Sequence, residues 1–133
     1  MTISKLTSFR FAVKDSPGVV SDFVVRFREA GADMEGMWGF SMGGGTGMVV
    51  VVAKDAGAFR AQVSSLKLAP EEITCFRLTA PDQKGALVET LGKIKAANIN
   101  VEAVDSVAVG GQVACYIWCV KNDIDKLAKT LGV

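Results

Sequence analysis

The chain contains no histidine, and this absence removes most of the familiar catalytic arrangements. Ser-His-Asp and Cys-His nucleophiles, histidine-ligated metals and the usual general base near neutral pH all require an imidazole. Acid–base chemistry would have to rest on Asp, Glu, Lys, Cys and the single tyrosine, Tyr116, and the sequence shows no convergent cluster of these. We therefore expect a protein that is not an enzyme, with a small enzyme as the least favoured alternative.

The three cysteines also favour a structural interpretation over a chemical one. Cys115 and Cys119 are four residues apart on an expected strand and so face the same side, and Cys75 lies on a strand expected to neighbour theirs. A zinc site needs a fourth ligand and shorter, loop-type spacing. A thiol nucleophile would lack a partner base. We predict small buried apolar side chains, no metal and no cofactor.

A glycine-rich segment, Gly43–Gly47, has the sequence GGGTG. A phosphate-binding loop would end in Gly-Lys-Ser/Thr and lead into a helix. This segment lacks that ending and leads into the valine-rich run 48–53. It is therefore interpreted as a flexible hairpin turn.

Composition narrows the class of protein further. Half of the 133 residues are hydrophobic and 22% are charged, which excludes intrinsic disorder. The net charge of +1 gives no global electrostatic case for binding nucleic acid or an acidic membrane. The odd number of cysteines, the lack of an apolar leader behind Met1–Leu6 and the short apolar runs predict a cytoplasmic protein.

Self-comparison reveals an internal repeat. A shift of 67 residues aligns the two halves without a gap, and the apolar pattern matches as well. The identical pairs are Thr7/Thr74, Phe9/Phe76, Arg10/Arg77, Asp15/Asp82, Gly18/Gly85, Ala30/Ala97, Glu35/Glu102, Gly43/Gly110, Gly44/Gly111, Lys54/Lys121 and Ala61/Ala128. We predict two domains, residues 1–69 and 70–133, joined near Ala69–Pro70.

Each repeat is predicted to follow the order β-α-β-β-α. Alternation of Phe9 and Phe11 with polar residues predicts a half-buried strand. Apolar residues at helical spacing then predict an amphipathic helix, with Ser16 as its N-cap and Pro17 at its first position. The expected buried helical residues are Val20, Phe23, Val24 and Phe27 in the first copy and Leu87, Val88, Leu91 and Ile94 in the second. The expected strands are 6–13, 34–42, 48–53, 73–79, 100–109 and 113–120, and the expected helices are 17–30, 55–66, 85–97 and 122–131.

The fold class that follows is α+β, with two ferredoxin-like βαββαβ repeats whose antiparallel sheets carry helices on one face. The fourth strand is the difficulty. Only residues 67–69 separate the second helix from Pro70, and only Gly132–Val133 follow the last helix. We expect a fourth strand that is short or absent in the first repeat and absent in the second. The open edges would need cover from the other repeat or another chain, which points to a homodimer.

Two segments resemble the ACT-domain family. Residues 11–20, FAVKDSPGVV, followed after a helix by AGADM at 30–34, are similar to its Asp-x-Pro-Gly turn and second-strand entry. The second copy shows DQKGAL at 82–87 and NINV at 98–101, with Lys84 in place of the proline. The resemblance covers nearly the whole chain. It implies a free-standing tandem ACT regulator, arranged as in glycine cleavage repressor-like proteins, that binds a small effector and acts on an enzyme or a transcription factor.

In such a regulator the effector is mostly an amino acid. The helix that follows each turn would offer its N-terminal amides to the ligand carboxylate, and Asp15 and Asp82 would receive the ammonium group. Gly18 and Gly85 would let the ligand approach the backbone. The candidate ligand-binding residues are Asp15, Ser16, Pro17, Gly18, Val19, Met37 and Trp38 in the first copy. Those in the second copy are Asp82, Gln83, Lys84, Gly85, Ala86, Val104 and Asp105.

Two other interpretations stay open at the level of sequence. Asp, Ser, Pro and Gly are common turn residues, so either aspartate could serve only to brace its turn. The departure at Lys84 and the missing strand also fit a protein–protein adaptor that keeps the fold and has lost ligand binding. Failure to bind any amino acid would favour the adaptor.

Overall fold

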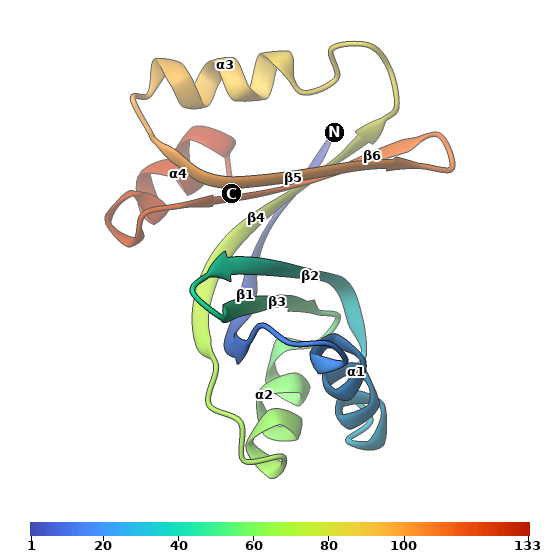
Figure 1. Ribbon diagram of the computed structural model, residues 1–133. Helices are drawn as coiled ribbons and strands as arrows, with labels where there is room; N and C mark the ends of the chain where they lie inside the picture. Colours follow the sequence, from blue (N-terminus) through green and yellow to red (C-terminus); the bar gives the residue numbers. More distant parts are fainter. The chain divides into compact units, whose positions relative to one another are not determined.

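A computed structural model describes residues 1–133 and contains four α-helices and six β-strands (Figure 1). The first half holds β1 (Thr2–Lys14), α1 (Val19–Glu29), β2 (Met34–Gly43), β3 (Thr46–Ala53) and α2 (Ala56–Ser65). The second half holds β4 (Glu71–Pro81), α3 (Val88–Ala96), β5 (Val101–Val109), β6 (Gln112–Cys119), a 3-10 turn η1 (Lys121–Asp123) and α4 (Ile124–Leu131). The predicted β-α-β-β-α order is confirmed in both halves.

The chain forms two compact units. We call residues Thr7–Ile73 the N-unit, and residues Met1–Leu6 together with Thr74–Val133 the C-unit. The sequence-based boundary at Pro70 stays a prediction about domains. Judged by its contacts, each unit also includes the first residues of the other repeat's first strand. The start of β4 belongs to the N-unit, and the start of β1 belongs to the C-unit.

These short segments occupy the place of the fourth strands. In the N-unit the strand order is β2-β3-β1, and the first residues of β4 lie next to β1. The Ser8 hydroxyl donates a hydrogen bond of 2.8 Å to the Ile73 carbonyl, and Arg10 lies 3.8 Å from Glu71. The residue number rises from Ser8 to Arg10 along β1 while that of the partner falls from Ile73 to Glu71. The added strand is therefore antiparallel to β1. The short fourth strand expected in the first repeat is thus provided by Glu71–Ile73.

The C-unit is completed in the same way from the N-terminus. Its order is β5-β6-β4, and the first residues of β1 lie next to β4. Arg77 contacts the Ser4 hydroxyl at 3.5 Å, and Ile3 packs against the C-unit core. Figure 1 shows this blue N-terminal segment passing β4. No strand follows α4, as predicted. The first residues of β1, within Met1–Leu6, lie beside β4 in the place of the fourth strand.

The N-unit core is aromatic. Phe9 and Phe11 of β1 point to one side and meet Phe27 of α1 and Phe59 of α2, with ring centroids 4.7 to 6.4 Å apart. Both helices lie on the same side of β1 and β3 in Figure 1. The predicted inward face of the first strand is therefore confirmed.

The C-unit core is mainly aliphatic. Phe76 and Leu78 of β4 and Ile117 of β6 pack with Ile94 of α3 and Leu127 of α4. Cys115 and Cys119 belong to the same cluster, and Cys75 is buried as well. All three thiols are unbridged. The small apolar role predicted for the cysteines agrees with these positions.

Three helical valines predicted to be buried are exposed. Val20 is 45%, Val24 39% and Val88 72% exposed. In α1 the rings of Phe23 and Phe27 occupy the contact with the sheet, which leaves the neighbouring valines outside it. Val88 is the first residue of α3, and its side chain lies at the exposed start of that helix.

The gapless alignment of the repeats is also wrong at the hairpins. β2 has an irregularity between Ser41 and Gly43, and Gly43 pairs with Thr46 at the turn. In the second repeat Val109 pairs with Gln112. Gly44–Gly45 therefore correspond to Gly110–Gly111, one position later than predicted, because the bulge inserts one residue into β2.

Candidate functional site

A hollow of about 210 Å³ lies where β1 turns into α1 in the N-unit. We call it the first hollow. Its walls come from the β1–α1 turn, the start of α1, the second half of β2 and the start of β3. The lining residues are Val13, Lys14, Asp15, Ser16, Val19, Val20, Gly39, Phe40, Ser41, Gly47, Met48 and Val49.

Asp15 is held at this hollow by two hydrogen bonds. Its backbone N–H donates to the Gly45 carbonyl at 3.0 Å, which ties the turn to the β2–β3 hairpin. The Ser41 hydroxyl donates to Oδ2 of Asp15 at 2.5 Å. One carboxylate oxygen is thereby fixed, while the other, Oδ1, has no partner within the protein. The arrangement places a fixed negative charge with spare acceptor capacity at an open hollow.

The adjoining helix end supplies the opposite polarity. Gly18 is the N-cap of α1, in the left-handed region at φ 88°, and no side chain caps the helix. The first intrahelical bond runs from the Asp22 N–H to the Gly18 carbonyl at 2.9 Å. The N–H groups of the first turn therefore lack helical partners and carry the positive end of the helix dipole.

The predicted cap at Ser16 is wrong for a steric reason. The N-cap is Gly18, whose φ of 88° would strain any residue that has a β-carbon. The helix therefore begins at Val19, two residues after the predicted start at Pro17. Ser16 contributes its carbonyl, which accepts from the Val19 N–H at 3.4 Å. Pro17 accordingly lies in the turn, outside α1.

Apart from Lys14, the rest of the first hollow is apolar. Valines from β1, α1 and β3 line it together with Phe40 of β2 and Met48 of β3. Two glycines also line it, Gly39 and Gly47. A β-carbon on Gly47 would lie 3.0 Å from the Phe40 carbonyl oxygen and 3.2 Å from Cγ2 of Val13. The hollow exists partly because this position has no side chain.

The second turn forms a hollow of about 290 Å³ in the C-unit, the second hollow. It is lined by Asp82, Gln83, Gly85, Ala86, Leu87, Val88, Leu91 and Val113. The Asp82 N–H donates to the Gly111 carbonyl at 2.9 Å, as the first turn does to its own hairpin. α3 also lacks a side-chain cap. No residue of β5 takes part, and the only strand residue in its wall is Val113 of β6.

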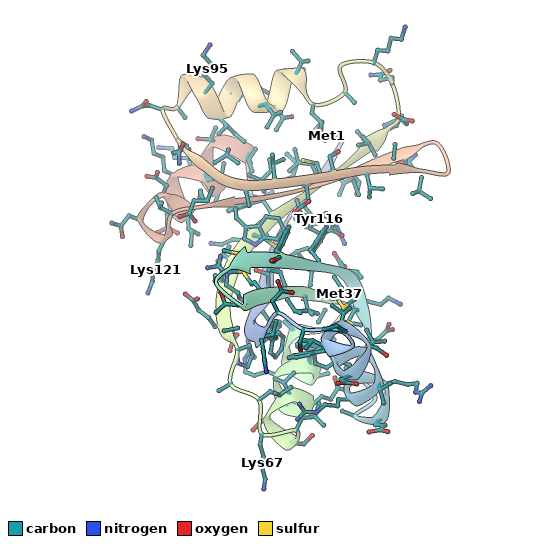
Figure 2. The ribbon with its side chains drawn as sticks, in the orientation of Figure 1. Met1, Met37, Lys67, Lys95, Tyr116 and Lys121 are labelled. Carbon is teal, nitrogen blue, oxygen red and sulfur yellow. The ribbon has the colours of Figure 1, made fainter.

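The predicted site residues therefore divide into two groups. Those brought to a hollow are Asp15, Ser16 and Val19 in the first copy and Asp82, Gln83, Gly85 and Ala86 in the second. Gly18 shapes the turn from outside the lining set. The remaining predicted residues, Pro17, Met37, Trp38, Lys84, Val104 and Asp105, line neither hollow. Met37 packs against the N-unit core (labelled in Figure 2), and the Trp38 ring lies against Gly36.

Residues in the second half of β2 were missed by the sequence analysis. Ser41 is the clearest example, because its hydroxyl fixes Asp15. Its place follows from strand register: Ser41 pairs with Gly47 on β3, and Gly47 pairs with Val13 on β1 next to the turn. Counting back from the hairpin along a regular register would have placed Met42 opposite Gly47, because the bulge between Ser41 and Gly43 cannot be read from the sequence.

The thiols offer little for chemistry. Burial, with a smaller contribution from Asp105, raises the pKa of Cys115 from 9.0 to about 11. Burial is also the main cause of a raised pKa at Cys119, assisted by the nearby carboxylates of Asp123 and Glu102. Raised pKa values keep both groups as neutral thiols, which are poor nucleophiles and poor metal ligands. No group of three or more Cys, Asp or Glu side chains is placed to hold a metal ion.

None of the helices combines the length and apolar character that a membrane crossing requires.

Comparisons with known proteins identify the fold. No family model matches the chain, and no curated protein matches it by sequence. Among solved structures, protein BT0572 from Bacteroides thetaiotaomicron is similar with a TM-score of 0.78 at 15% identity, over 98% of this chain and 87% of that one. The regulatory subunit of aspartate kinase from Thermus thermophilus, in its ligand-free form, gives 0.61 at 12% identity, over 98% and 93%.

A structure of aspartokinase alpha and beta subunits gives a TM-score of 0.63 at 12% identity, over 98% of this chain and 95% of that one. The likeness to these structures confirms the predicted ACT-like, ferredoxin-like α+β fold. At such identities the comparison establishes the architecture alone.

Proposed function

We propose that this chain is a non-catalytic regulatory protein that binds an amino acid, or a similar small zwitterion, in the first hollow. The observation that carries the proposal is the pairing of a fixed carboxylate, Asp15, with the uncapped N-terminus of α1 at one small hollow. An α-amino acid carries the complementary groups, an ammonium and a carboxylate. Oδ1 of Asp15 would accept from the ammonium, and the first-turn amides would donate to the carboxylate.

Three further observations support a regulatory role. The thiols are buried and neutral, and the structure offers no metal cluster. Two of the structures that share the fold are subunits of an amino acid kinase, one of them described as its regulatory subunit. We propose by analogy that the partner of this chain is an enzyme or a transcription factor whose activity follows the effector concentration. Free buried cysteines are compatible with a cytoplasmic location.

The test is a binding screen of the intact protein against the twenty amino acids, by thermal shift and then by calorimetry. At 100 times the dissociation constant a ligand of the folded state adds about 2.7 kcal/mol, enough to raise the midpoint by several degrees. Asp15→Asn should weaken binding about 10- to 100-fold, because it removes a charge-assisted hydrogen bond.

The matched control is Asp33→Asn. Asp33 is another exposed N-unit carboxylate, paired with Lys54 at 3.0 Å and outside the first hollow. It should leave the affinity unchanged. A well-folded wild-type protein that binds no amino acid would contradict the proposal.

A second candidate, a protein–protein adaptor, is favoured by the edge strands. β2 exposes Phe40 (45%) and Met42 (58%), and β5 exposes Val104 (51%), Val107 (56%) and Val109 (72%). Unpaired edges with apolar side chains are common association sites. We propose that a second copy of the chain pairs with one of these edges to give a homodimer. Analytical ultracentrifugation of the wild type and of Val107→Lys measures this, and a monomeric wild type at micromolar concentration would exclude it.

A further inference from the structure

We propose that the effector of the first hollow is an amino acid with an uncharged, aliphatic side chain, and that Gly39 sets the size of the side chain it accepts. This inference rests on the proposed function and concerns the part of the ligand that neither Asp15 nor α1 recognises. It follows from how polar and apolar groups are distributed around the hollow.

Polar groups are confined to one end of the hollow. Asp15 and Ser16 belong to the β1–α1 turn, and the Ser41 hydroxyl donates a hydrogen bond to Asp15. With the α-ammonium and α-carboxylate held at that end, the ligand side chain must extend along the wall formed by Val20, Phe40 and Met48. Such a wall offers no hydrogen-bond partner, so a polar side chain would lose its hydration without compensation.

The charged residue nearest to this wall is Lys14. It is exposed and lies at the end of β1, paired with Thr46 at the mouth of the β2–β3 hairpin. An acidic side chain is the alternative that Lys14 would favour, and the binding experiment below separates it from an aliphatic one.

The size of the hollow also limits the side chain. A volume of about 210 Å³ is below the range of roughly 300–1,000 Å³ typical of drug-sized ligands. Exposed fractions of 45% at both Val20 and Phe40 show that these apolar side chains are incompletely covered in the unliganded chain. An aliphatic side chain laid across them would remove that area from water, at about 25 cal/mol per Å².

Gly39 lies at the back of this wall. It pairs with Val49 on β3, and a β-carbon built on it would lie 3.6 Å from Cγ2 of Val20 on α1. That distance is ordinary van der Waals contact, so an alanine fits without moving either element. A methyl group there would occupy the space between β2 and α1 that a branched side chain needs. Gly39 is therefore a specificity-determining position that can be altered without loss of the fold.

The experiment compares wild type with Gly39→Ala by calorimetry against alanine, valine, leucine, isoleucine, phenylalanine, serine, aspartate and lysine. We expect valine, leucine or isoleucine to bind wild type most tightly. In Gly39→Ala their dissociation constants should rise about 10-fold or more, the scale of one methylene in an apolar pocket, while that of alanine changes less than 3-fold. The control, Gly57→Ala, makes the same change in α2, outside the hollow, and should alter no affinity.

The outcomes separate this inference from the proposed function. Tightest binding of aspartate, lysine or serine, lost in Asp15→Asn, would keep the amino acid site and overturn the aliphatic specificity. Unchanged discrimination in Gly39→Ala, with a circular dichroism spectrum and thermal midpoint like wild type, would overturn the role of Gly39. Absence of binding by every amino acid would overturn both.

Discussion

The two turns of this protein share an Asp-x-x-Gly pattern, yet they stand beside different hollows. The first is walled by residues of three strands and a helix, and the Ser41 hydroxyl donates a hydrogen bond to its aspartate. The second has only a turn, a helix and Val113 around it. The hairpin registers explain the difference: Ser41 pairs with Gly47 in the N-unit, whereas Ala108 pairs with Val113 in the C-unit. The second repeat has the methyl group of Ala108 in place of the Ser41 hydroxyl, and the buried side chain of Val113 in place of Gly47.

This comparison shows that a repeated turn alone does not repeat a site. Each turn supplies a carboxylate and a helix end, but the facing strands decide which side chains surround the hollow beside it. The two cores also differ in the kinds of side chain that fill them. Aromatic rings fill the N-unit core, and aliphatic side chains with Cys115 and Cys119 fill the C-unit core.

The largest expected effect comes from the equivalent core positions Phe27 and Ile94. Both are fully buried at the same point of α1 and α3. Phe27→Ala should lower the free energy of unfolding by about 3–5 kcal/mol and Ile94→Ala by about 2–5 kcal/mol, because each leaves a cavity. Urea denaturation followed by circular dichroism measures both. The ring contacts of Phe27 with Phe11 and Phe59 predict the greater loss for Phe27, and equal losses would contradict that reasoning.

A smaller effect on stability, with a large one on binding, is expected from Gly47→Val, which gives the first hollow the wall residue of the second. The nearest contact of an added β-carbon, 3.0 Å to the Phe40 carbonyl, predicts a loss of about 1–3 kcal/mol from overpacking. Amino acid binding should fall at least 10-fold in calorimetry. The matched control is Gly44→Ala in the hairpin, where the positive φ of 63° strains the turn but no atom lies within 4 Å. Retained binding in a folded Gly47→Val protein would disconnect the first hollow from the ligand.

The smallest expected effect is a dependence of stability on alkaline pH that comes from a buried thiol of the C-unit, Cys115. The pKa of Cys115 is raised from 9.0 to about 11, so the folded state disfavours the thiolate more than the unfolded state does. By linkage this group's contribution is complete below pH 9.0 and is lost as the pH rises through about 11. Thermal midpoints from pH 7 to 11 of wild type and Cys115→Ala measure it. Both lines falling in parallel above pH 9 would show that Cys115 has no such role.

Several elements were predictable because their determinants are local. Alternation identified the core face of β1, with Phe9 and Phe11 inward, and helical spacing placed Phe27 and Ile94 in the cores. The exposed valines were mispredicted because spacing gives the direction of a face but not its width. Val20 has the right phase and still lies beside the sheet contact.

The candidate site was predictable only as far as its turns. Asp15 and Asp82 are recognisable from the sequence, since a carboxylate before a helix-starting glycine is a local pattern. Ser41 and Gly47 were not, because their roles depend on strand register and on a bulge within β2. The helix cap was also misplaced, since a serine before a proline resembles a cap until the positive φ of Gly18 is known.

By itself, then, the sequence determined the tandem β-α-β-β-α order, the absence of histidine chemistry and the two acidic turns, all of which follow from composition and short-range spacing. Tertiary structure alone decided where the fourth strands come from and which side chains surround each turn. Both depend on contacts between residues distant in the chain: Ile73 beside Ser8, Ile3 in the C-unit core, and Ser41 on Asp15. Such pairings are set by register and by packing across strands, which no local pattern encodes.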